Sequence, residues 1–178
     1  DEGRLQRRMY RMFGVEGANS LYFATNAKLI GSGLDGQLEN FVQEHRDTRL
    51  IVIDTLQKVR ETINDTYSYS SDYDVIGKLK QFADKHGVCV LIVHHTRKQP
   101  AGDSFEMISG TTGLLGCADG ALLMQKEKRT DGKATLDIVG RDQPDQRLYL
   151  TKDQEHLVWE LERAENELWK QPPDPVLE

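Results

Sequence analysis

The chain has 178 residues, and 23 lysines and arginines against 29 aspartates and glutamates give it a formal net charge of −6. Its length is sufficient for one domain with a real core, and 38% hydrophobic with 29% charged residues is ordinary for a soluble globular protein. The acidic balance argues against a protein that coats nucleic acid along its whole length, although it allows a local basic patch. The longest apolar run, Val88–Val93, is too short to span a membrane and no signal peptide is visible, so we expect a cytoplasmic protein with no membrane partner.

The first part of the chain predicts helices that alternate with strands. Asp1–Phe13 carries apolar residues on one helical face, and Gly14 is suited to end that helix. Leu21–Thr25 is a short run of strand type, and Leu34–His45 repeats apolar residues at helical spacing. Leu50–Asp54 is an unbroken apolar run that ends in an aspartate, which is typical of a strand buried on both faces of a parallel sheet.

The middle of the chain repeats this pattern around a polar segment. Lys58–Ser70 is polar and predicts a long loop. Ser71–Asp74 resembles a capping box that opens a helix, and Gly87 is expected to close it. Val88–Val93 predicts a second buried strand, which runs into two adjacent histidines.

The last part of the chain predicts hairpins. Gln99–Gly113 is rich in Gly, Ser and Thr and predicts a flexible connection, and Asp131–Gly132 is a hairpin signal. Four short strands are expected, over residues 121–124, 135–139, 148–151 and 157–161. The residues after Glu162 are polar and rich in proline, so we expect one domain over 1–162 and a loose tail over 163–178.

This order of elements predicts an α/β fold, with a mostly parallel sheet flanked by helices and a C-terminal antiparallel hairpin extension. In open α/β sheets, ligands bind at the carboxyl ends of the strands. The candidate residues at those ends are Asp54, His94 and His95.

These residue types suit phosphate chemistry. An aspartate at the end of a buried strand, as Asp54 is, holds Mg²⁺ through water in phosphate-transfer ATPases, and a helix cap or turn is the simpler alternative. Neighbours on a strand point to opposite faces, so at most one of His94 and His95 can reach a given site, where it could sense a terminal phosphate. A purely structural histidine is the alternative.

A third candidate is Arg141, which follows the expected strand at the tip of a hairpin. A guanidinium group there could reach the phosphates bound to a neighbouring subunit. A surface ion pair with Asp142 or Asp145 is the alternative.

A glycine pattern has to be weighed as well. Gly31–Gly36 reads G-x-G-x-x-G, and Asp54 lies near the distance at which dinucleotide-binding folds place their ribose-binding acid. That fingerprint requires an apolar strand directly before the first glycine, whereas Asn26–Lys28 intervene here, so a strand-to-helix turn is favoured. The phosphate-binding pattern G-x-x-x-x-G-K-[ST] does not occur in this sequence.

Several segments carry a resemblance to a known family: Leu50–Gln57, Val90–Lys98, the glycines within Ser109–Gly120, and Gly140–Asp142. In that order they resemble the Walker B strand, the sensor strand, the segment that follows it and the arginine-bearing hairpin of RecA-like ATPases of the RepA type. These are hexameric replicative helicases of plasmids and phages and their relatives. Asp1–Gly14 is similar to the helix that follows the strand with the family's catalytic glutamate. The Walker A strand, loop and helix, and that glutamate, would therefore come before Asp1.

The resemblance implies roles for individual residues. Asp54 would hold the Mg²⁺ of bound ATP, with Thr55 and His94 also at the nucleotide. His95 would contact the γ-phosphate, with His94 as the alternative, and Arg141 would act in trans on the ATP of the next subunit.

The resemblance also implies partners and a function. The loops over 58–70 and 97–112 would face a central channel for single-stranded DNA, with Arg97 and Lys98 as contacts. The chain would be the C-terminal portion of an ATP-hydrolysing, DNA-dependent ring motor, expected to be a hexamer, and would be inactive as a fragment. Two alternatives remain: an NAD-binding enzyme built on Gly31–Gly36, and a regulatory RecA-like module that does not hydrolyse ATP.

Overall fold

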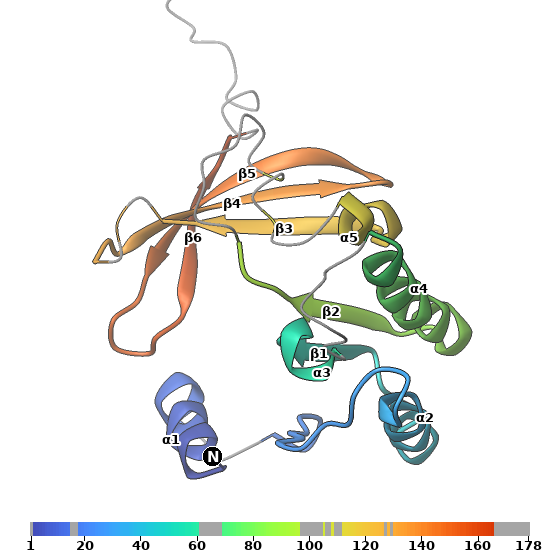
Figure 1. The fold of residues 1–178 in the computed structure, drawn as a ribbon. Coiled ribbons are helices and arrows are strands. Elements are labelled where there is room, and N and C mark those ends of the chain that lie inside the picture. Colours follow the sequence, from blue (N-terminus) through green and yellow to red (C-terminus); the bar gives the residue numbers. More distant parts are fainter. Residues whose placement is uncertain are drawn as a thin grey trace, which may run out of the picture. The chain divides into compact units, whose positions relative to one another are not determined.

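The computed structural model describes residues 2–14, 18–60, 69–96, 105, 108, 112–126, 128 and 130–165 (Figure 1). The chain divides into two compact units, one of Asn26–Ala118 and one of Asp1–Thr25 with Asp119–Glu178. We call them the parallel-sheet unit and the antiparallel-sheet unit. In the ranges just given, every helix is too short or too polar to cross a lipid bilayer.

The described residues of the parallel-sheet unit form a two-stranded sheet and four helices. In chain order these are α2 (Leu34–Glu44), β1 (Leu50–Asp54), α3 (Leu56–Val59), α4 (Tyr69–His86), β2 (Cys89–Val93) and α5 (Thr112–Cys117). The strands β1 and β2 are parallel, with Leu50 opposite Cys89 and Asp54 opposite Val93. The predicted strands and the helix over 34–45 are confirmed.

The core of this unit lies on one face of the sheet. Alternate residues of the strands, such as Ile53, pack there against the apolar stripes of the helices, and Leu56 and Leu79 are 1% and 2% exposed. The opposite face carries Leu50, Val52, Leu91 and Val93, which are 37–54% exposed. The prediction that both faces of these strands are buried is therefore wrong for the described residues, because the helices cover only one face.

Two glycines end helices as the sequence predicts. Gly14 and Gly87 follow α1 and α4 with φ of 68° and 61°, a conformation that glycine adopts without a steric cost. The start of α4 differs from the prediction, because the helix begins at Tyr69 and the capping-box residues Ser71–Asp74 lie inside it. The two ends of the expected loop over 58–70 are helical, in α3 and α4, and residues 61–68 lie outside the described part of the chain.

The antiparallel-sheet unit consists of α1 (Glu2–Phe13) and the strands β3 (Gly120–Gln125), β4 (Lys133–Gly140), β5 (Gln143–Lys152) and β6 (Trp159–Ala164). The four strands pair in sequence order and all antiparallel, so the predicted run of hairpins is confirmed. In the β3–β4 turn, the backbone N–H of Lys128 donates to Asp131 Oδ2 at 2.9 Å, which is the capping that an Asp-Gly turn favours.

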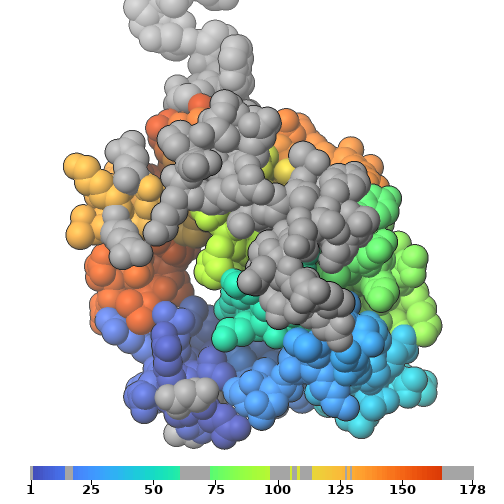
Figure 2. Space-filling model, viewed as in Figure 1, coloured from blue at the N-terminus to red at the C-terminus, as the bar shows by residue number. Residues whose placement is uncertain are grey.

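Helix α1 docks on the β5–β6 hairpin of the same unit. The Arg11 guanidinium donates to the carbonyl oxygens of Glu155 and Gln154, at 2.8 and 3.0 Å. Met9, on another face of α1, is only 7% exposed. Figure 2 shows the blue atoms of α1 beside the orange atoms of this hairpin. The predicted helix is thus present and tied to a segment more than 140 residues away.

The predicted strand over Leu21–Thr25 is wrong. In the structure this stretch is irregular, and Leu21, Tyr22 and Phe23 are 43–54% exposed. An apolar run forms a strand only when another strand pairs with it, and none of the described strands does so here. The fold is therefore α/β as expected, but among the described residues the larger sheet is antiparallel and the parallel pairing is that of β1 with β2.

Candidate functional site

The candidate site residues of the parallel-sheet unit gather at the carboxyl edge of its sheet. Asp54 is the last residue of β1 and lies opposite Val93, the last residue of β2, so His94 and His95 follow one step beyond it on the neighbouring strand. Parallel strands end at the same edge of a sheet, which is the usual place for ligands in α/β folds. The structure thus brings together the three residues that the sequence singles out for this edge.

The alternation of side chains along the strands separates the two histidines. Val52, Asp54 and Val93 belong to the uncovered face, whereas Ile53 belongs to the core face. Continuing the alternation of β2 places His95 on the face of Val93 and Asp54, and this agrees with an exposed His95 and a half-buried His94. His95 is therefore the histidine that shares a face with Asp54.

The short helix α3, which follows directly after this edge, is fixed by packing and by a backbone hydrogen bond. Asp54 is followed by Thr55, which has extended backbone angles and precedes α3. Leu56 and Val59 of α3 are buried at 1% and 4% exposure, and the N–H of Ile30 donates to the Val59 carbonyl at 2.7 Å. The Thr55 hydroxyl makes no capping bond to α3. Two oxygen-bearing side chains thus stand next to each other at the start of a fixed turn.

The donor set at this edge fits magnesium bound together with phosphates. Among the described residues, no group of three or more His, Cys, Asp or Glu side chains is arranged to enclose a metal ion. Mg²⁺ seldom needs such a cage, because it keeps several waters and takes one or two carboxylates together with the phosphate oxygens of a substrate. A single exposed carboxylate at a strand end, as Asp54 provides, is suited to that arrangement.

A charge cluster holds the two long helices of this unit together. The carboxylate of Glu39 on α2 lies 2.7 Å from Lys85 Nζ and 3.0 Å from His86 Nε2, both on α4. The hydrogen bond from Lys85 is the main cause that lowers the pKa of Glu39 below its usual value, and the nearby His86 imidazole lowers it further. Glu39, Lys85 and His86 are separated from Asp54 along the chain. They form ion pairs between α2 and α4, so we interpret them as structural.

Arg141 lies in the antiparallel-sheet unit, in the turn between β4 and β5. Its backbone N–H donates to the Asp119 carbonyl at 3.0 Å, and its Nη1 lies 3.6 Å from Asp119 Oδ1. The sequence indicated Asp142 or Asp145 as possible ion-pair partners, and the structure shows an ion pair of Arg141 with Asp119. Sequence reasoning missed Asp119 because the pairing depends on strand register. The glycine pair Gly120 and Gly140, which lie opposite each other, is the one signal that could have indicated it.

The glycine pattern has no dinucleotide-binding context. Residues 18–30 form no strand, and Gly31 and Gly33 have φ of 82° and 115° in a turn that leads into α2. An NAD-binding fingerprint needs a strand that runs into the first glycine, so this alternative is wrong. The favoured alternative of a glycine-bearing turn before a helix is what the structure has, although no strand precedes it.

The two proposed DNA contacts, Arg97 and Lys98, lie outside the described residues. The chain on either side is described at two points, where Thr96 and Ile108 form an antiparallel bridge. The bridge places Thr96, just beyond β2, beside Ile108.

A comparison with protein families places these observations in context. The model of a family described as AAA domain matches residues 1–101, which is more than half of the chain. No curated protein matches the chain. The matched range runs from α1 through β2 and includes Asp54, Thr55 and both histidines, whereas Arg141 lies beyond it. The chain therefore belongs to the AAA domain family of ATPase-type domains.

Proposed function

We propose that this chain forms part of an ATP-hydrolysing, DNA-dependent ring motor, a helicase of the RepA type or a related ATPase. The observation that carries the proposal is the carboxyl edge of the sheet, where Asp54 ends β1 and His95 follows β2 on the same face. Membership of the AAA domain family supports ATP as the ligand of that edge. The subunits associate into a ring, which we expect to be a hexamer in the cytoplasm.

Each residue has one task in this proposal. With Mg²⁺–ATP bound, the chemistry is attack of a water molecule on the γ-phosphoryl group, and catalysis is mainly positioning and charge stabilisation. Asp54 and Thr55 hold the metal side of the nucleotide, and His94 is the alternative to His95 as the residue that senses the phosphate. His95 donates a hydrogen bond to a γ-phosphate oxygen. Arg141 places its guanidinium group against the phosphates bound to the neighbouring subunit.

An Asp54→Asn variant of the full-length protein tests the ATPase proposal. The change removes the negative charge and keeps the shape, and we expect kcat for Mg²⁺-dependent ATP hydrolysis to fall about 100-fold or more. Because Asp54 is exposed, the variant should fold as the parent does. Asp35→Asn is the matched control, since Asp35 is an exposed aspartate in the first turn of α2. Full activity of Asp54→Asn would refute the proposal. A parent that never hydrolyses ATP would favour the regulatory module.

The DNA contacts need a separate experiment. If Arg97 and Lys98 each bind a phosphate of single-stranded DNA, changing either to alanine weakens binding for every sequence. It also reduces the slope of log affinity against log salt by about 0.7, which is the value for one lost phosphate contact on a single strand. Fluorescence anisotropy of a labelled oligonucleotide, titrated at several salt concentrations, measures both quantities. An unchanged slope would show that these side chains do not contact the DNA backbone.

A further inference from the structure

The start of β3 and the end of β4 approach each other unusually closely. Gly120 lies opposite Gly140 in the antiparallel register. A Cβ atom added to Gly120 would come within 2.8 Å of the Val139 carbonyl oxygen, a distance that real Cβ atoms essentially never show. Gly120 therefore permits a backbone approach to Val139 and Gly140 that a side chain at position 120 would prevent.

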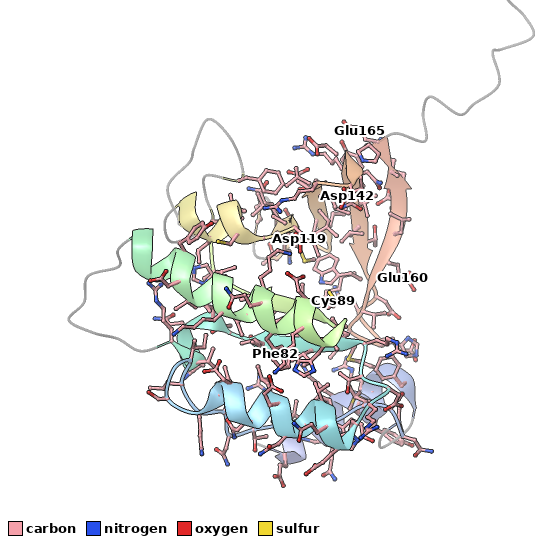
Figure 3. The ribbon with its side chains drawn as sticks, turned by 90° about the vertical axis from the view of Figure 1, so that its right-hand side faces the viewer. Phe82, Cys89, Asp119, Asp142, Glu160 and Glu165 are labelled. Carbon is pink, nitrogen blue, oxygen red and sulfur yellow. The ribbon has the colours of Figure 1, made fainter. Side chains whose placement is uncertain are left out.

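This approach brings Asp119 and Arg141 together, one residue beyond each glycine. The backbone bond from the Arg141 N–H to the Asp119 carbonyl, 3.0 Å long, extends the strand ladder past the glycine pair. The side chains then meet at 3.6 Å, between Nη1 and Oδ1. Figure 3 labels Asp119 at this end of the sheet, together with Asp142 of the adjacent turn. The contact thus follows from the backbone geometry and not from a chance meeting of two long side chains.

The contact between Arg141 and Asp119 is weak, and this suits an arginine side chain that exchanges the carboxylate for a phosphate. The side chains of Arg141 and Asp119 are 56% and 64% exposed, so water and salt screen their attraction. The carboxylate restricts the rotamers of the guanidinium group without burying it. A bound triphosphate carries more negative charge than one carboxylate and can take over the contact.

Asp119 also stands at a junction in the chain. Helix α5 ends at Cys117, which is 7% exposed in the core of the parallel-sheet unit. Asp119 is the first residue of the segment that builds the antiparallel sheet. The residue that pairs with Arg141 is therefore tied, through a single intervening residue, to the unit that carries Asp54.

We propose that Asp119 is a positioning residue for Arg141, whose guanidinium group it holds at the start of β3 in the orientation from which that group contacts the phosphates of the neighbouring subunit. The inference rests on the proposed function, because Arg141 acquires its phosphate contact there. Asp119 itself touches neither the nucleotide nor the reacting atoms.

A double-mutant cycle in the full-length protein tests this role. We expect Asp119→Ala to lower kcat for ATP hydrolysis about threefold, the size of effect typical of an exposed ion pair, and to leave the KM for ATP unchanged. Asp119→Glu retains the carboxylate and should keep most of the activity. In an Arg141→Ala background, Asp119→Ala should cause no further loss, because Asp119 acts only through the guanidinium group.

The possible outcomes separate this inference from the proposed function. Asp142→Ala is the control, since it removes the same charge from the adjacent turn, and it should leave kcat unchanged. An equal loss in Asp142→Ala, or an equal loss from Asp119→Ala in both backgrounds, would overturn the positioning role and leave the ATPase proposal standing. Full activity of Asp119→Ala, together with an inactive Arg141→Ala, would also overturn the positioning role and leave the ATPase proposal standing. An Arg141→Ala variant with unchanged hydrolysis would refute the role of Arg141 itself, and the inference about Asp119 with it.

Discussion

Asp137 and Arg147 form a bidentate charge pair in the antiparallel-sheet unit. They lie directly opposite each other on β4 and β5, and the guanidinium group binds both carboxylate oxygens, at 2.5 and 3.0 Å. The Asp137 side chain is 8% exposed and that of Arg147 is 43% exposed. Asp137 raises the pKa of Arg147 above its usual value, through their hydrogen bond first and their charge attraction second. Bidentate pairs of this kind fix geometry as well as charge.

The asymmetric burial of this pair predicts an asymmetric response to mutation. Arg147→Ala leaves a buried carboxylate without its partner, and we expect the free energy of unfolding to fall by about 2–3 kcal/mol. Asp137→Asn releases a guanidinium group that water already reaches, so its cost should be about 1 kcal/mol. Urea unfolding followed by circular dichroism measures both. Lys133→Ala, which breaks an exposed pair with Glu162, is the control and should change little. Equal costs for the two changes would contradict the burial argument.

A second pair, in the β5–β6 turn, predicts a pH dependence. His156 Nδ1 lies 2.6 Å from Asp153 Oδ2, and this hydrogen bond raises the pKa of His156 and lowers the pKa of Asp153. The stabilisation from His156 is complete below the ordinary histidine pKa of about 6.5 and is lost as the pH rises through the raised value. The stabilisation from Asp153 is present above the ordinary aspartate pKa of about 3.9 and is lost as the pH falls through the lowered value. The turn that binds Arg11 is therefore most firmly held in mildly acidic solution, between these limits.

An NMR titration of the histidine ring protons tests this pair. We expect His156 to titrate above about 6.5 and to return towards that value in Asp153→Asn. Glu160→Gln is the control, because charge attraction from Glu160 is the weakest of the influences on His156. An unchanged titration in Asp153→Asn would show that the hydrogen bond does not persist in solution.

The turn before α2 predicts opposite effects for two glycines of one motif. Gly33 has a φ of 115°, and a Cβ atom there would lie 2.6 Å from Lys28 Cδ, so Gly33→Ala should destabilise the chain by about 1–2 kcal/mol. Gly36 lies inside α2, and an added Cβ atom would meet nothing within 4 Å, so Gly36→Ala should stabilise the chain by about 0.5–1 kcal/mol. Thermal unfolding of the two variants measures both signs. A loss of stability in Gly36→Ala would show that this position is constrained by something other than helix propensity.

Helix ends and strand pairs differ in how far local sequence determines them. Gly14 and Gly87 end their helices as predicted, because a left-handed residue after a helix is a local requirement that glycine meets. Tyr69 begins α4 earlier than the cap-like Ser71–Asp74 indicates, because the packing of a long apolar stripe decides the helix more than one capping pattern does. Leu21–Thr25 fails as a strand for a related reason, since strand formation depends on a partner that the local sequence does not contain.

The same distinction holds for the candidate site. Asp54, His94 and His95 could be placed at one edge from the sequence alone, since two buried apolar runs joined by a helix predict parallel strands whose carboxyl ends coincide. The ion pair of Arg141 with Asp119 could not be predicted from the sequence, because it depends on which residues face each other in an antiparallel register. The extent of burial was not predictable either, since apolar strands look alike whether a sheet is covered on one face or on both.

At the scale of the whole molecule, the proposed motor requires that one catalytic centre be shared between two subunits. Asp54 and Arg141 belong to different compact units of the chain. In a ring with head-to-tail interfaces, each subunit can offer Asp54 to its own nucleotide and Arg141 to that of its neighbour. A variant that lacks either Asp54 or Arg141 should then be unable to hydrolyse ATP by itself.

Mixing the two inactive variants tests this sharing directly. When full-length Asp54→Asn and Arg141→Ala subunits exchange freely at equal concentration, about one interface in four pairs an intact Asp54 with an intact Arg141, so about a quarter of the wild-type activity should return. Steady-state ATP hydrolysis of the mixture, against each variant alone and a mixture with the doubly substituted subunit, measures the recovery. The doubly substituted subunit supplies neither residue and should rescue nothing. If the mixture stays inactive although the subunits exchange, Arg141 acts within its own subunit and the ring does not share its catalytic centres.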